Sequence, residues 1–310
     1  MAQVLVFGKN GQVAMALREQ VAELANESIL PGGFRAEDWI FLSSKEADFN
    51  NPDSIIALLN VHNPLIIINA AAYTAVDKAE NEKVPAMKIN GVTPGHIAKW
   101  CYENKASLIH YSTDYVFSGD GVVPWKENDP VGPLNHYGLT KLEGEKQIAG
   151  SGCHHIVLRT SWIYSPAGTN FVRTILRLGN ERDELKIVND QVGSPTSALE
   201  IARATLEIMD HPGFRDHSLG GIYHLAGEGF VSWFEFAKEI IVKTRALGLR
   251  LIVKNVLPIQ TADYPTPAKR PLNSRLDQSK IGKDFGWKST SWQSSLEEVL
   301  EEITVREAGR

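Results

Sequence analysis

Short apolar runs recur along the first half of the chain, and segments with helically spaced apolar positions separate them. The runs are rich in Val, Ile and Leu, as is typical of strands that a parallel sheet buries on both faces. They span residues 4–7, 39–42, 65–69, 107–112 and 155–159. Helices are predicted between them, one running through Met15, Leu17 and Val21 and others over residues 54–59, 94–102 and 139–148. The alternation predicts an α/β fold built on a doubly wound parallel sheet.

A glycine-rich turn follows the first predicted strand directly. Gly8 permits a tight turn, Gly11 lets the backbone approach a pyrophosphate, and the small side chain of Ala14 lets the next helix pack on the strand. Gln12 and Val13 begin that helix, whose first N–H groups would point at the phosphates. The turn therefore predicts an NAD(P) site in a Rossmann domain, although glycine-rich loops also occur in other α/β domains.

The second half of the chain is less regular after about Trp162. We expect helices at 170–178, 198–209 and 232–247, a loop at 189–196, a strand at 221–226 and a proline-rich stretch at 264–271. The chain has no internal repeat and no Gly/Ser linker, so the second part would grow out of the first. We expect an NAD(P)-binding Rossmann domain over 1–165, with a return segment near 220–230, and a smaller α/β substrate-binding domain over 166–310.

The composition excludes several classes of partner. The chain has 310 residues, of which 43% are hydrophobic and 22% charged, with a formal net charge of −5. This balance offers no basic surface for nucleic acid or for an anionic membrane. Neither a signal peptide nor an apolar run of membrane-spanning length is evident, so we expect a cytoplasmic protein.

The two cysteines, Cys101 and Cys153, do not have the spacing of a metal site. Cys153 precedes His154 and His155, but this short run lacks the other ligands that zinc requires. We expect both thiols to be structural.

Tyr137 and Lys141 lie four residues apart in a segment predicted to be helical, so both side chains would share one helix face. A free phenol has a pKa near 10, and a neighbouring ammonium favours the phenolate; we therefore expect Lys141 to lower the pKa of Tyr137 towards neutrality, where proton transfer is efficient. The alternative is two side chains on a solvated helix face. Of the eight tyrosines, however, only Tyr137 has a lysine at this distance.

Several motifs, taken together and in this order, resemble those of a known superfamily. The extended short-chain dehydrogenases/reductases share the motifs Gly8-x-x-Gly11-x-x-Ala14, Asn69-Ala-Ala-Ala72, Ser112-Thr113 and Tyr137-x-x-x-Lys141. More narrowly, the chain is similar nearly end to end to the dTDP-4-dehydrorhamnose reductase family. That resemblance rests on the runs from Asn69 to Glu80, His110 to Phe117 and Arg159 to Trp162, on Asn189-Asp-Gln191 with Gly193-x-Pro-Thr196, and on Lys269-Arg-Pro-x-Asn-Ser274.

The resemblance implies a reductase that uses NAD(P)H. Hydride from the nicotinamide would attack the C4 carbonyl of dTDP-4-dehydro-β-L-rhamnose and give dTDP-L-rhamnose, the last step of dTDP-rhamnose biosynthesis. Tyr137 would donate the proton to the carbonyl oxygen, and Lys141 would orient Tyr137 and bind the cofactor ribose. The hydroxyl of Thr113 would stabilise the negative charge that develops on the same oxygen.

The resemblance also assigns binding residues. Asp114 would touch the sugar, and Trp162 would pack against it, although a lone Trp is more often part of a core. Arg270 is expected to bind the diphosphate, in preference to Lys269, because a guanidinium offers a bidentate fork. The small residues Ala70, Ala71 and Ala72 would lie against the cofactor, and Asp48 and Phe49 on its adenine side.

The end of the second predicted strand departs from the usual NAD pattern. An acidic residue there would bind both ribose hydroxyls, whereas Ser43, Ser44 and Lys45 follow Leu42. With no carboxylate to repel a 2′-phosphate, and with two hydroxyls and an ammonium to bind it, we expect NADPH, with NADH as a possible alternative.

Other functions stay open at this point. The chain also resembles the non-catalytic NADP-binding regulatory subunit that partners methionine adenosyltransferase, but Thr113, Tyr137 and Lys141 together favour an enzyme. An epimerase or dehydratase of nucleotide sugars would keep the fold, and Asp114 would suit a dehydratase. Some relatives bind a metal between two subunits through glutamates; two of the matching positions are Ala16 and Leu199, so we expect no metal and leave a homodimer open.

Overall fold

The computed structural model describes residues 3–25 and 31–308. Its centre is a six-stranded parallel sheet in the order β10-β5-β4-β3-β1-β2. The strands are β1 (Val4–Phe7), β2 (Trp39–Leu42), β3 (Ile66–Asn69), β4 (Ser107–Thr113), β5 (His155–Thr160) and β10 (Gly221–His224). The strand order reverses between β1 and β3, and ligands of open α/β sheets bind at such a point, beyond the carboxyl ends of the strands.

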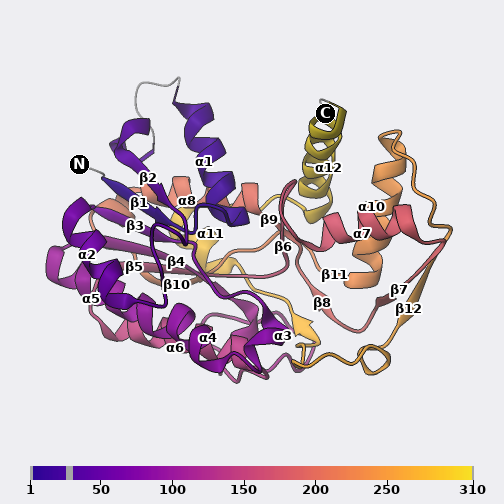
Figure 1. Ribbon diagram of the computed structural model, residues 1–310, viewed down its shortest axis with the longest axis horizontal. Helices are drawn as coiled ribbons and strands as arrows, with labels where there is room; N and C mark the ends of the chain where they lie inside the picture. The colour runs from indigo at the N-terminus through magenta and orange to yellow at the C-terminus, as the bar shows by residue number, and fades with distance from the viewer. Residues whose placement is uncertain (1–2, 26–30, 309–310) are drawn as a thin grey trace.

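Helices cover both faces of this sheet, as Figure 1 shows. One face carries α1 (Gln12–Leu24), α8 (Ala198–Asp210), α9 (Pro212–Arg215) and α11 (Ser279–Phe285). The other carries α2 (Pro52–His62), α5 (Thr93–Asn104) and α6 (His136–Gly150), with α3 (Val76–Ala79) and α4 (Lys83–Met87) against α6. A π-helical turn, Lys88–Val92, joins α4 to α5. Successive side chains along a strand point to opposite faces of the sheet, so they enter two separate apolar cores, one on each face.

The second half of the chain builds a separate apolar core, on the right in Figure 1. Its helices are α7 (Phe171–Glu181), α10 (Trp233–Ala246) and α12 (Trp292–Ala308), and its paired strands are β7 (Glu184–Val188) and β12 (Asn255–Ile259). Short strands join the two halves, namely β6 (Ile163–Tyr164), β8 (Val192–Gly193), β9 (Thr196–Ser197), β11 (Val231–Ser232) and β13 (Asn273–Ser274). Among the described residues, no helix combines the length and the apolar character needed to cross a membrane.

The doubly wound parallel sheet and the helices predicted for the first half are confirmed. The structure differs in the second half. Helix α8 was expected on the substrate side, yet Ile201 and Leu206 bury in the same core as β1 and β4, so α8 lies on the sheet beside α1. The expected loop at 189–196 contains β8 and the start of β9. Helix α12 was not predicted, although Leu296, Val299 and Ile303 have helical spacing.

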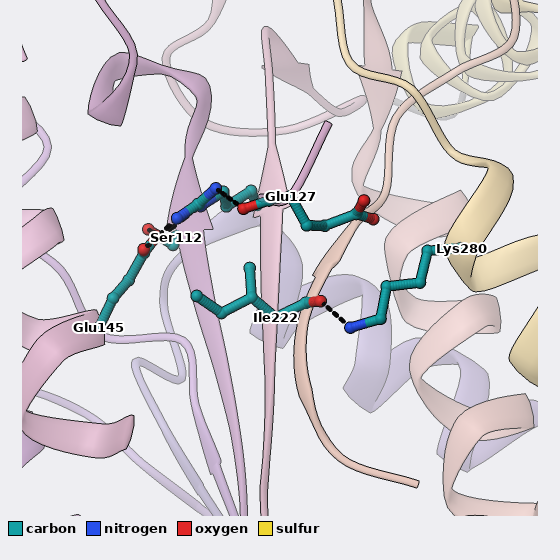
Figure 2. A network of polar contacts seen from close by, with 6 residues as sticks. Ser112, Glu127, Glu145, Ile222 and Lys280 are labelled. Carbon is teal, nitrogen blue, oxygen red and sulfur yellow. Dashed lines mark hydrogen bonds and ion pairs between the residues drawn. The ribbon is translucent and has the colours of Figure 1, made fainter. Parts of the chain in front are cut away.

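A buried ion pair holds α6 against the sheet (Figure 2). The guanidinium of Arg159 on β5 lies 2.7 Å from the carboxylate of Glu145 on α6, and both side chains are almost inaccessible to solvent. The hydroxyl of Ser112 donates to the same carboxylate over 2.5 Å, and Arg159 also donates to the carbonyl of Glu127. Because α6 carries Tyr137 and Lys141, this network positions the helix on which the predicted chemistry depends.

Candidate active site

The glycine turn packs directly against the end of β3. Gly8 has a φ of +89°, and a Cβ at this position would lie 2.6 Å from the carbonyl carbon of Ala70. Only glycine fits such a backbone and such a close approach. Helix α1 starts just beyond, at Gln12, and within the described chain no side chain caps it and no acidic residue occupies its first turn. Its first N–H groups are therefore suited to bind an anion.

A cavity of about 250 Å³ opens beside this turn. Its lining contains most of the residues predicted to bind the cofactor, namely Gly8, Gly11, Ser44, Asp48, Phe49, Ala70, Ala71 and Ala72, together with Asn10, Ala47, Asn50 and Ile89. The glycines and alanines in this lining let a dinucleotide approach the backbone closely.

Gln12 and Val13 do not line the cavity with their side chains. The amide oxygen of Gln12 accepts hydrogen bonds from Ser165 and Asn170, both at 2.9 Å, and Val13 lies in the core between α1 and the sheet. Any contact of these two residues with a cofactor would therefore use the backbone.

The loop after β2 contains a carboxylate that the sequence interpretation overlooked. Glu46 accepts hydrogen bonds from the backbone N–H of Ser43 over 2.8 Å and from its hydroxyl over 2.7 Å. These bonds lower the pKa of Glu46, and the positive charge of Lys9 lowers it further. The premise that no carboxylate lies beside the serines is therefore wrong: Glu46 folds back onto Ser43, while Ser44 and Lys45 stay exposed.

Thr113, Asp114 and Tyr137 meet at the carboxyl end of β4. Thr113 is the last residue of β4, and its hydroxyl donates to the carboxylate of Asp114 over 3.1 Å. Tyr137 is the second residue of α6, whose first turn is capped by the side chain of Asn135. Gly138 lets this turn pack on the carbonyl of Tyr115, where a Cβ would collide. The rings of Tyr115 and Tyr137 meet edge to face, with centroids 5.8 Å apart.

The pKa of Tyr137 moves in the direction opposite to that expected. Burial raises it, a hydrogen bond with Thr113 opposes this rise, and the negative charge of Asp114 adds to it. The Nζ of Lys141 contacts other groups: it lies 2.6 Å from the carbonyl oxygen of Tyr111 and 3.1 Å from Nε2 of His110. Burial lowers the pKa of Lys141 to about 8, against the opposing charge of Glu145.

Asp114 is itself an unusual group. It is 3% exposed, and among the described residues its Oδ2 has no hydrogen-bond partner. Burial raises the pKa of Asp114 to about 7, although hydrogen bonds from Ser274 and Thr113 act against the rise. A carboxyl group of this kind can be neutral or charged near neutral pH, and its unpartnered oxygen suits a polar ligand.

Trp162 lies where the two halves of the molecule meet. Its φ of +51° is rare for a bulky residue, and its ring stacks on Trp233 with centroids 3.4 Å apart. A Cβ at Gly193 would lie 2.8 Å from the ring of Trp162, so a glycine is needed there. Strained residues concentrate at ligand sites, but one face of Trp162 is already covered by Trp233.

The stretch of chain just before β13 brings Arg270 to the same region. Its guanidinium pairs with Asp77 over 2.8 Å, and its side chain is 20% exposed. The charges of Arg270, Asp77 and Asp114 all act on the pKa of Tyr115, which packs on Tyr137. The fold thus gathers the predicted catalytic residues with Asp114 and Arg270, whereas Trp162 lies towards the second half.

The sequence interpretation did not single out Asp77 or His110. Both lie inside motifs that resemble the reductase family, the run from Asn69 to Glu80 and the run from His110 to Phe117. Their positions in those runs were the only sign in the sequence that the two residues could belong to the site. Their partners, Arg270 and Lys141, are distant in sequence, so the contacts themselves could not be read from the chain.

Comparisons with known proteins identify the family of the chain. Residues 1–305 match the family described as the RmlD substrate binding domain. A dTDP-4-dehydrorhamnose reductase from Escherichia coli (strain K12) is 40% identical over 300 residues, covering 97% of each chain.

Two solved structures extend the comparison. A dTDP-4-dehydrorhamnose reductase from Clostridium acetobutylicum has a TM-score of 0.86 at 35% identity, covering 97% of this chain and 99% of that one. The enzyme from Bacillus anthracis, crystallised in complex with NADP, has a TM-score of 0.85 at 33% identity, covering 97% of this chain and 100% of that one. With a family match over nearly its whole length and relatives of such similarity, the chain belongs to the dTDP-4-dehydrorhamnose reductase family.

Proposed function

We propose that this protein catalyses the NADPH-dependent reduction of the C4 keto group of dTDP-4-dehydro-β-L-rhamnose to give dTDP-L-rhamnose. The observation that carries the proposal is the meeting of Tyr137, Thr113 and Asp114 at the carboxyl end of β4. The glycine turn and its cavity lie at the same edge of the sheet, where the strand order reverses between β1 and β3. Membership of the reductase family supports the same activity.

Each residue of the site has a separate role in the reaction. A bound NADPH supplies the hydride. Tyr137 donates its phenolic proton to the C4 oxygen, and because burial raises its pKa it holds that proton at neutral pH until the oxygen becomes basic. The hydroxyl of Thr113 donates a hydrogen bond to the same oxygen while negative charge develops. Lys141, fixed on the carbonyl of Tyr111, orients the cofactor ribose.

The substrate would lie between the sheet and the second half of the chain. Asp114 would bind a sugar hydroxyl through its unpartnered oxygen, and Trp162 would pack against the hexose. Arg270 would bind the diphosphate, exchanging part of its contact with Asp77 for the phosphates.

We propose NADPH as the preferred cofactor and NADH as a slower substitute. Ser44 and Lys45 are exposed next to the cavity and suit a 2′-phosphate. Glu46 acts against this preference, because its carboxylate accepts the hydrogen bond of the Ser43 hydroxyl and places a negative charge in the same loop. A relative that binds NADP supports the assignment.

The test is a stoichiometric assay with the purified protein, NADPH and dTDP-4-dehydro-L-rhamnose, run alongside related 4-keto nucleotide sugars. We expect one NADPH oxidised for each dTDP-rhamnose formed, with the product identified by NMR. Sugar conversion without net oxidation of NADPH would indicate an epimerase or a dehydratase. Tight NADPH binding without any turnover of these sugars would favour a regulatory subunit.

A further inference from the structure

The side chain that caps the first turn of α6 has a second contact outside the helix. Oδ1 of Asn135 accepts a hydrogen bond from the backbone N–H of Gly138 over 2.8 Å, which is the ordinary contact of an N-cap. Nδ2 of the same amide donates to the carbonyl oxygen of Lys269 over 2.8 Å. Asn135 is 7% exposed, so water has little access to either contact. One amide therefore joins α6 to a part of the chain that is 134 residues away in sequence.

Lys269 lies between two residues that a different helix binds. Asp77 on α3 accepts hydrogen bonds from the backbone N–H of Ala268 over 3.2 Å and from the guanidinium of Arg270 over 2.8 Å. The guanidinium also donates to the carbonyl oxygen of Ala268 over 2.9 Å. Residues 268–270 are therefore bound from α3 through Asp77 and from α6 through Asn135.

The residues near the two ends of this contact belong to the proposed site. Tyr137, two residues after Asn135, is the proposed proton donor, and Arg270, next to Lys269, is the proposed ligand of the diphosphate. The guanidinium is close enough to Tyr115 for its charge to oppose the rise that burial causes in the pKa of that phenol. The ring of Tyr115 in turn packs on that of Tyr137. Asn135 thus connects the backbone beside the proton donor with the backbone beside the phosphate ligand.

Helix capping alone does not require an asparagine at this position. Serine and aspartate cap helices about as well as asparagine, because each offers an oxygen to the N–H groups of the first turn. Aspartate has no N–H, however, and serine is too short to cap Gly138 and reach Lys269 at the same time. The NH₂ group is what Asn135 contributes beyond a cap, and it binds only the segment that contains Arg270.

We infer that Asn135 is a positioning residue that fixes the guanidinium of Arg270 relative to Tyr137, and so sets where the diphosphate lies when the C4 carbonyl meets the proton donor. The inference rests on the function proposed above. Asn135 acts through Lys269 and Arg270, so it needs no contact with the substrate. Without the NH₂ group, α6 would keep its cap while the backbone of Lys269 would lose its bond to the helix. The loss should therefore fall on nucleotide binding, and not on the fold or on the cofactor.

Asn135→Ser separates the two contacts, because the hydroxyl keeps the cap without reaching Lys269. We expect the Kd for dTDP, measured by isothermal titration, and the KM for the dTDP-sugar to rise about fivefold, with the Kd for NADPH, the kcat and the urea midpoint nearly unchanged. Asn135→Ala removes the cap as well and should also lower the urea midpoint. Asn51→Ser makes the same change at the exposed N-cap of α2 and is the matched control, which should leave all these values in place.

A double-mutant cycle tests whether the effect passes through Arg270. In the Arg270→Ala background, Asn135→Ser should not raise the Kd for dTDP any further. An Asn135→Ser variant that binds dTDP no more weakly than the wild type would show that Asn135 is only a cap, and would overturn the inference. An equal rise in Kd with and without Arg270 would also overturn it. Because dTDP binding needs no turnover, a cycle with the expected result in a protein that does not reduce the sugar would overturn the proposed function alone.

Discussion

Arg270 donates to the carboxylate of Asp77 over 2.8 Å, although 193 residues separate them in the chain. The backbone N–H of Ala268 donates to the same carboxylate, so Asp77 on α3 binds the chain at two positions shortly before β13. The hydrogen bond with Arg270 is the main reason that the pKa of Asp77 is lowered. The guanidinium is therefore positioned beside the Thr113 and Tyr137 cluster by the protein itself.

Replacing Arg270 should weaken substrate binding selectively. In Arg270→Ala we expect the KM for the dTDP-sugar to rise about tenfold or more, because a bidentate contact with the diphosphate is lost, while NADPH affinity stays unchanged. Isothermal titration with dTDP measures the binding step alone. Arg250→Ala, at an exposed arginine, is the control. If Arg270→Ala binds dTDP as tightly as the wild type, another residue must bind the diphosphate.

Removing the phenolic hydroxyl of Tyr137 should abolish most of the turnover without affecting the fold. We expect Tyr137→Phe to lower kcat by roughly two to four orders of magnitude and to leave NADPH affinity nearly unchanged. Tyr102→Phe, at a tyrosine that is 60% exposed on α5, should retain full activity. A Tyr137→Phe variant with more than about a third of the wild-type kcat would rule out this residue as the proton donor.

Glu46 should decide how strongly the enzyme prefers NADPH. Glu46→Gln removes a negative charge next to Ser43, so we expect the ratio of kcat/KM for NADPH to that for NADH to rise several-fold. Ser43→Asp should shift the ratio towards NADH, because a carboxylate there repels a 2′-phosphate. Both ratios come from initial rates at saturating sugar. Unchanged ratios in both variants would show that the loop after β2 does not select the cofactor.

Breaking the buried ion pair of Glu145 and Arg159 should lower the free energy of unfolding more than breaking an exposed ion pair does. Glu145→Gln leaves the guanidinium of Arg159 buried without its counter-ion, and we expect a loss of about 3–5 kcal/mol in the free energy of unfolding. The control is Glu181→Gln, which breaks an exposed pair with Arg177 and should cost at most about 0.5 kcal/mol. Urea unfolding of both variants gives the comparison, and equal losses would contradict this account.

Asp114 should make the protein less stable as the pH rises. Its pKa is about 7 in the folded protein and near 3.9 in an unfolded chain, so the folded state holds the proton more tightly. Its favourable contribution is therefore complete below about pH 4 and is lost as the pH rises through about 7. Asp114→Asn should be more stable than the wild type by about 2–4 kcal/mol at about pH 8, with little difference near pH 4. Urea midpoints across this range test the sign.

The parallel sheet and the glycine turn could be read from the sequence because they depend on local signals. The predicted strands of the first half are short runs rich in Val, Ile and Leu, and Gly8 is required by the backbone at the end of β1. Tyr137 and Lys141 could be paired because the helical repeat places them on one face. Helix α8 could not be assigned to the sheet in this way, because its apolar face is equally compatible with either half of the chain.

The partners of the charged groups were decided only by the tertiary structure. Helical spacing brought Lys141 near Tyr137, but the ammonium binds His110 and Tyr111, which β4 presents from beneath α6. Glu46 and Ser43 are three residues apart, yet only the folded loop turns the carboxylate back onto the hydroxyl. Local spacing limits which side chains can meet, whereas burial and the geometry of each hydrogen bond decide which groups do meet and which protonation states they adopt.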